Sequence, residues 1–169
     1  MGRFRRPAPQ DRDRQGAEVR PARRASGHRP TIEGSPVSMT DEDRILARLD
    51  EFGRLLASRD LGIVDALSNR LGVTLFGSEA GERAGSREEL LALFGGLFAR
   101  PYGLAFAWQD RHVTIEGDIA WVIAEGLLHV VHPDHDVPTP YRLVSIFQRH
   151  AGAWHWRLFS GSEPAPPPA

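Results

Sequence analysis

The stretch that decides the fold is residues 117–131, GDIAWVIAEGLLHVV. After Gly117-Asp118, β-branched, aromatic and other apolar residues continue to Val131 without a proline, which is typical of a long strand. Neighbouring side chains of a strand point to opposite faces, so one face carries Trp121, Ile123, Glu125, Leu127 and His129. The other face carries Val122, Ala124, Leu128 and Val130. Because both faces are mainly apolar, we expect helices to cover one and a second copy of the chain to cover the other.

Further strands are predicted on both sides of this one, at residues 104–115, 141–149 and 154–159. Residues 116–118 and 150–153 have the composition of hairpin turns, whereas residues 132–140 are predicted to form a longer loop. The second half of the chain is therefore predicted to be an antiparallel meander.

The first half is predicted to be mainly helical. Thr40 with Asp43 and Ser86 with Glu89 match the capping box that begins many helices. Apolar residues then recur at helical spacing, at Ile45, Leu49, Phe52 and Leu56 in the first helix and at Leu90, Leu93, Phe94 and Leu97 in a later one that ends before Pro101. A short helix at 63–67 and a strand at 73–76 lie between them. Helices on one face of an antiparallel sheet make an α+β fold.

Residues 39–164 are predicted to form one domain, and residues 165–169 a Pro-rich C-terminal tail. Residues 1–38 contain nine Arg, five Pro and one aromatic residue, which predicts a disordered tail. Two alternatives are that Met39 is the initiator and that the tail binds an acidic partner. The tail has a charge of +5, which leaves −6 for the remainder, so nucleic-acid binding by the domain is not expected.

Composition excludes several kinds of chemistry. The chain has no cysteine and no lysine, which excludes disulfides, thiolate nucleophiles and Schiff bases. No dinucleotide-binding fingerprint occurs, and we expect no cofactor. His129, His132, Asp134, His135 and Asp136 match no established zinc spacing, so a solvated loop is favoured over a metal site. No apolar run has the length of a membrane span or follows the N-terminal arginines as in an export signal, so we expect a cytoplasmic protein.

Several strings in the expected order resemble the SnoaL-like branch of the nuclear transport factor 2-like superfamily. They are Phe76-Gly77-Ser78 with Gly81 and Gly85, residues 117–122 with Glu125-Gly126, and Tyr141-Arg142 followed by residues 154–164. The resemblance implies a curved, mostly antiparallel sheet wrapped around the N-terminal helices, with a conical cavity. Members include ketosteroid isomerases, polyketide cyclases, epoxide hydrolases, dehydratases and non-catalytic modules. The first helix offers Phe52 and no tyrosine for an oxyanion, which departs from the isomerases.

Glu125 and His129 are the predicted catalytic residues. Glu125 interrupts an apolar strand face, and a carboxyl beside an indole in a dry cavity would have the raised pKa that suits a general acid or base. The alternative is a structural glutamate paired with Arg111 or Arg142. His129 lies four strand residues away, about 13 Å, so the two side chains cannot form a dyad. His129 would then orient a substrate or serve as a structural histidine.

Six aromatic residues are predicted to line the cavity, unless they only pack the core or a dimer interface: Phe52, Phe76, Trp108, Trp121, Trp156 and Phe159. Arg142 is either an anchor for an anionic ligand or the partner of Glu163. We therefore expect a homodimeric, cofactor-independent isomerase, cyclase or lyase acting on an apolar, aromatic or polycyclic metabolite. The alternative is a ligand-binding or dimerisation module without turnover.

Overall fold

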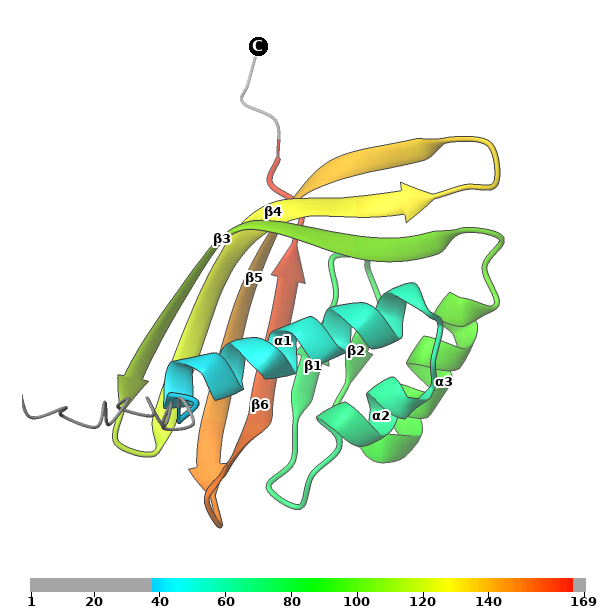
Figure 1. Cartoon of the computed structure of the whole chain (residues 1–169). Coiled ribbons are helices and arrows are strands. Elements are labelled where there is room, and N and C mark those ends of the chain that lie inside the picture. Colours follow the sequence, from blue (N-terminus) through cyan, green and yellow to red (C-terminus); the bar gives the residue numbers. More distant parts are fainter. Residues whose placement is uncertain (1–37, 166–169) are drawn as a thin grey trace, which may run out of the picture. The chain divides into compact units, whose positions relative to one another are not determined.

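The computed structural model describes residues 38–165, and the two predicted tails lie outside them except at their inner ends. The chain forms three helices and six strands over these residues (Figure 1). The helices are α1 (Asp41–Ala57), α2 (Gly62–Leu67) and α3 (Arg87–Phe98). The strands are β1 (Thr74–Phe76), β2 (Arg83–Ala84), β3 (Gly103–Glu116), β4 (Ile119–Val131), β5 (Asp136–His150) and β6 (Ala153–Ser162). No helix within residues 38–165 combines the length and hydrophobicity of a membrane span.

The six strands form one sheet in the order β2-β1-β6-β5-β4-β3. Strands β3 to β6 pair antiparallel in chain order, whereas β1 pairs parallel to β6. The sheet is curved, and α1 lies across its concave face, with α2 and α3 beside one end (Figure 1). The predicted meander and α+β class are confirmed, and β2 is an addition that the sequence did not indicate.

Strand β5 is longer than predicted, because residues 136–140 belong to it and not to a loop. This segment contains Pro138 and Pro140, which lie in the stretch 132–140 that was predicted to be a loop. It pairs only with β4, since the last β5–β6 pair is Arg142 with Ser162. A proline is tolerated at such a free edge because its missing N–H has no partner to lose.

Both predicted capping sites begin helices. Thr40 and Asp43 form a reciprocal capping box at α1, with the Thr40 hydroxyl accepting from the Asp43 amide at 3.1 Å. Ser86 accepts from the Glu89 amide at α3, but the Glu89 carboxylate reaches back to the amide of Gly85. The predicted apolar face of α1 is buried against the sheet, which fixes the helix over the concave side.

The two faces of β4 have different neighbours. Ala120, Val122, Ala124 and Leu128 are buried on the concave side under the helices, while Ile123 and Glu125 are exposed on the convex side. Gly126 lies opposite Trp108, next to a bulge in β3, and a Cβ there would collide with the Ala107 carbonyl. Gly126 therefore leaves room for the β3 backbone where the bulge brings the two strands close together.

Ser145 provides a test of the core. It is 0% exposed on β5, and its hydroxyl has no hydrogen-bond partner among residues 38–165. Removing a buried hydroxyl without a partner relieves a desolvation cost, so we expect Ser145→Ala to raise the free energy of unfolding by about 1 kcal/mol in urea titrations. Ser86→Ala, which removes a helix cap, is the matched change and should lower it by about 1 kcal/mol. Equal losses in both variants would contradict this account.

Candidate functional site

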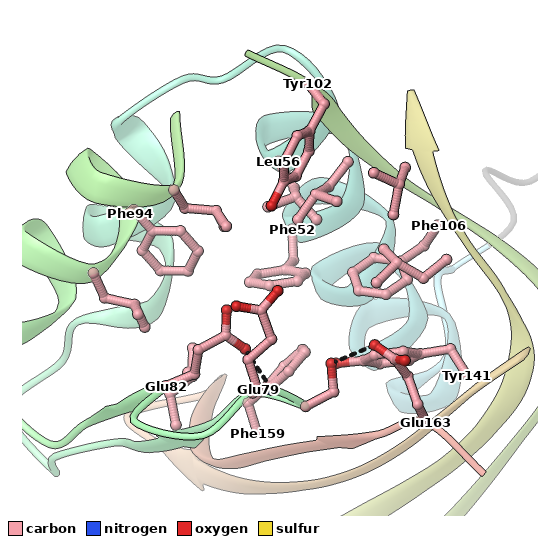
Figure 2. Close-up of a pocket in the computed structure, with 18 residues that line it drawn as sticks. Phe52, Leu56, Glu79, Glu82, Phe94, Tyr102, Phe106, Tyr141, Phe159 and Glu163 are labelled. Atoms are coloured by element: carbon pink, nitrogen blue, oxygen red, sulfur yellow. Dashed lines mark hydrogen bonds between the residues drawn. The ribbon is translucent and has the colours of Figure 1, made fainter. Parts of the chain in front are cut away.

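A cavity of about 100 Å³ lies between α1, α3 and the concave face of the sheet (Figure 2). Its walls are apolar and rich in aromatic rings, mainly Phe52, Phe94, Phe106 and Phe159. The Phe52 ring contacts the other three, with centroid distances of 6.3 Å to Phe94, 6.2 Å to Phe106 and 4.8 Å to Phe159. An apolar cavity with a few converging polar groups is the usual form of a small-molecule site.

The polar groups of the cavity come from three parts of the fold. Ser78, Glu79 and Glu82 belong to the loop between β1 and β2, while Tyr102 follows α3. Tyr141 and Glu163 come from β5 and the end of β6, and both tyrosines of the chain therefore line this cavity. In Figure 2 the carboxylates of Glu79 and Glu82 and the hydroxyl of Tyr102 point toward the interior.

Tyr141 is the most deeply buried polar side chain of the lining, at 4% exposure. Burial raises the pKa of its phenol well above the ordinary value of 10.0, and the negative charges of Glu82 and then Glu163 raise it further. A hydrogen bond from Ser78 acts in the opposite direction. The phenol is therefore neutral at physiological pH and keeps a proton to donate.

Two glycines make room for these groups. A Cβ at Gly161 would collide with the Tyr141 hydroxyl, and one at Gly77 would collide with the Glu82 carboxylate. The Glu82 carboxylate also accepts a hydrogen bond from the Glu79 amide at 3.1 Å, and the Glu163 carboxylate accepts one from the Ser78 hydroxyl at 2.9 Å. The positions of both carboxylates are thus set by short contacts within the site.

Arg100 lies outside the lining but contacts two of its polar side chains, those of Glu79 and Tyr102. Its guanidinium donates two hydrogen bonds to Glu79, at 3.0 and 2.9 Å, and a third to the Tyr102 hydroxyl at 2.8 Å. The Arg100 hydrogen bond lowers the pKa of Glu79 below its ordinary value of 4.5. Because the Tyr102 oxygen accepts from Arg100, its own proton is available to a ligand.

The Glu79–Arg100 pair predicts a pH dependence of stability. A carboxylate whose folded pKa is lowered contributes stability above its unfolded pKa, here 4.5, and loses that contribution as the pH falls through the folded value. We expect the Tm of Glu79→Gln to fall less than that of the unmodified chain as the pH is lowered from 6 to 3, a range chosen to bracket carboxylate titration at about 4. Parallel Tm curves would show that the pair does not contribute.

Glu125 and Arg142, two of the predicted site residues, lie outside this cavity. They face each other across β4 and β5 on the convex face of the sheet, with 3.0 Å between Arg142 Nε and Glu125 Oε1 and side chains that are 60% and 58% exposed. The expectation that Glu125 faces a dry cavity is therefore corrected, and the alternative of a glutamate paired with Arg142 matches the structure. Arg142 does not pair with Glu163, whose carboxylate contacts Ser78.

His129 lies on the same convex face, where its Nδ1 is 2.6 Å from a carboxylate oxygen of Asp136. His135 contacts Asp134 in the same way, and its ring stacks on that of His132 at 4.3 Å. None of these residues lines the cavity. Within residues 38–165, no three histidine, aspartate or glutamate side chains are grouped closely enough to hold a metal ion. His129 is thus placed as a hydrogen-bonded surface histidine.

The six predicted aromatic residues separate into different environments. Phe52 and Phe159 line the cavity as expected. Trp156 is buried in the core behind them at 1% exposure, and Trp108 packs on Phe106 at 4.7 Å outside the lining. Phe76 is exposed under the guanidinium of Arg83, and Trp121 is half-buried on the convex side.

Sequence reasoning missed the polar half of the site, which consists of Ser78, Glu79, Glu82, Tyr102, Tyr141 and Glu163. One signal was present for Tyr141, because it shares strand parity with Leu143 and Phe147, which are typical core residues. No local pattern pointed to Glu79 and Glu82, since a loop between two very short strands has no periodicity.

Comparison with known proteins places the chain in a family. A model described as a SnoaL-like domain matches residues 45–166. A search of curated proteins found no match.

Solved structures share the fold at low identity. One is a candidate dehydratase of the nuclear transport factor 2-like family from Streptomyces avermitilis, with a TM-score of 0.64, 15% identity, and coverage of 75% of this chain and 97% of that one. A candidate scytalone dehydratase from Novosphingobium aromaticivorans has a TM-score of 0.62 and 9% identity, with coverage of 73% of this chain and 84% of that one. A Catenulispora acidiphila protein in complex with S-DNPA has a TM-score of 0.63 and 10% identity, with coverage of 72% of this chain and 92% of that one. Such identities show the fold alone, and the family model adds the assignment. The chain belongs to the SnoaL-like family, and it shares the fold of a nuclear transport factor 2-like structure.

Proposed function

We propose that the protein is a cofactor-independent lyase or isomerase that removes a proton from carbon in a small aromatic or apolar molecule bound in this cavity. The observation that carries the proposal is the position of Tyr141, a buried neutral phenol flanked by the carboxylates of Glu82 and Glu163 in an aromatic-walled cavity. A hydrogen-bond donor and a carboxylate base in one apolar site are what such chemistry needs.

The roles follow from the contacts. Glu82 is half-buried, and one of its oxygens is held by the Glu79 amide, which leaves the other to accept a proton from the substrate carbon. Tyr141 donates a hydrogen bond to the substrate oxygen on which negative charge develops. Tyr102, anchored by Arg100, supplies a second phenol proton on the opposite side. The aromatic rings around these groups lower the local dielectric constant below that of bulk water, which strengthens the interactions.

The proposal agrees with two of the relatives, which are described as candidate dehydratases. Dehydration also begins with proton loss from carbon and needs a donor for the departing oxygen. The same groups could close a ring by generating a carbanion, so a cyclase uses the site equally well.

The test is proton abstraction from a nitrobenzisoxazole, whose ring opens to a coloured phenolate when a base removes its carbon-bound proton. We expect the full chain to accelerate this reaction above buffer containing equal acetate, because the cavity holds the bound probe next to a positioned carboxylate. Glu82→Gln should abolish the acceleration, while Glu116→Gln, which makes the same charge change in a hairpin distant from the lining, should retain it. Acceleration that survives Glu82→Gln would refute the assigned base.

A second candidate is a dimerisation module without turnover, and the convex face of the sheet favours it. Ile123 pairs with Val144 and Trp121 with Ile146 across β4 and β5, and the first two are 47% and 44% exposed. This apolar patch lies beside the Glu125–Arg142 ion pair. A second copy of the chain related by a two-fold axis would cover the patch, and its Glu125 and Arg142 would lie close enough to pair with those of the first copy. Light scattering should show a dimer that Ile123→Glu converts to a folded monomer. A monomeric unmodified chain would exclude it.

A further inference from the structure

The charge of the cavity mouth limits the kind of ligand that it can hold. Three carboxylates line the cavity, those of the half-buried Glu82 and the exposed Glu79 and Glu163, and we call this partly exposed group the mouth. The lining contains no arginine or histidine. The sequence has no lysine that could balance them. Of the three, Glu79 is neutralised by Arg100 through two hydrogen bonds.

The other two carboxylates have only neutral partners. Glu82 accepts from a backbone amide and Glu163 from the Ser78 hydroxyl, and neither forms an ion pair with any residue between 38 and 165. Their charges reach the interior, because both act on the pKa of the buried Tyr141 phenol. An anionic ligand would therefore meet two negative charges without a compensating cation.

The aromatic walls of the cavity favour a cationic ligand. Phe52, Phe106 and Phe159 present clustered rings beside these carboxylates, with centroid distances of 6.2 and 4.8 Å from Phe52. An aromatic face attracts a cation, and the attraction grows when the cation leaves bulk water. Carboxylates at the mouth and rings in the interior together form the environment that an arylalkyl ammonium group prefers.

We propose that the ligand of this cavity is a cationic small molecule, an aromatic or apolar skeleton that carries a protonated amine, with the ammonium group held between Glu82 and Glu163. The inference rests on the proposed function, since it assigns the substrate class of the same site.

The experiment compares three probes of equal size and different charge, benzylamine, benzyl alcohol and benzoate, by calorimetric titration of the full chain at neutral pH. We expect protonated benzylamine to bind about tenfold more tightly than benzyl alcohol, which corresponds to one partly desolvated ion pair, and benzoate to bind least. High salt should reduce this preference, because it screens the mouth charges.

Variants assign the preference to the site. Glu82→Gln and Glu163→Gln should each lower the ratio of benzylamine to benzyl alcohol affinity severalfold, whereas Glu116→Gln should leave it unchanged. Tighter binding of benzoate, or a ratio that both cavity variants leave intact, would overturn the inference.

The outcomes separate this inference from the proposed function. Equal binding of all three probes would leave a functional cavity that does not select charge, which refutes the cationic ligand alone. If no probe binds and the nitrobenzisoxazole is not turned over, the cavity is not a site, and both proposals fall.

Discussion

Tyr141→Phe is expected to lower turnover about 100-fold while leaving ligand binding within a few-fold, because it removes one hydrogen-bond donor from the developing oxygen anion. The substitution keeps the ring that packs on Phe106 at 5.0 Å, so the fold should be retained. The measurement is kcat and KM for the nitrobenzisoxazole or for any substrate found with it. A loss confined to kcat identifies an interaction made mainly in the transition state.

A second variant checks that position matters as well as chemistry. Gly161→Ala keeps the phenol but places a methyl group where the Tyr141 hydroxyl lies, so the hydroxyl must move. We expect kcat to fall in this variant too, with the Tm measured in parallel to detect unfolding. If Tyr141→Phe retains full activity in a folded protein, Tyr141 is part of the cavity wall and not a donor to the reaction.

Trp156→Ala is expected to lower the free energy of unfolding by about 3–5 kcal/mol, the usual loss for a large aromatic residue removed from a core. Trp156 is 1% exposed and packs against Phe147, Phe52 and Phe159 with ring centroids 4.4, 5.8 and 6.1 Å away. A domain of this size has roughly 5–15 kcal/mol of stability in total, so much of it would be lost. Chemical denaturation followed by circular dichroism measures the change.

The matched control is Trp121→Ala, which makes the same truncation on the convex face, where the indole is half-buried. This truncation should lower the free energy of unfolding far less than Trp156→Ala does, at protein concentrations where the chain is monomeric. Equal losses at the two positions would show that the inner packing around Trp156 does not dominate stability. The pair of variants also separates the roles that the sequence left open for its tryptophans, namely cavity wall, core and interface.

The placement of Glu125 shows where sequence reasoning reached its limit. The strand from 119 to 131 was predicted with its correct bounds, and its pairing with residues near Asp110 follows from the hairpin turn at Gly117. Its two faces were also separated correctly. Which face turned toward the helices could not be predicted, because both are apolar and a change of one residue exchanges them.

The aromatic residues show a similar limit. Phe52 was correctly placed in the cavity because helical spacing relates it to Ile45, Leu49 and Leu56, so its face was fixed by the helix period. Phe76 was placed wrongly because its strand is three residues long, and so short a segment does not show which parity is buried. Its neighbour Leu75 lines the cavity instead.

What the sequence by itself determined is local: the capped helices, the four long strands and their hairpins, and hence the α+β class. These features depend on periodicity and on caps, which act within a few residues. The tertiary structure alone decided that Tyr141, Glu82 and Glu163 meet in one cavity and that Glu125 lies outside it. Such assembly depends on the packing of α1 against β3 and of α3 against β2, interactions between segments that are distant in the chain and that no single pattern encodes.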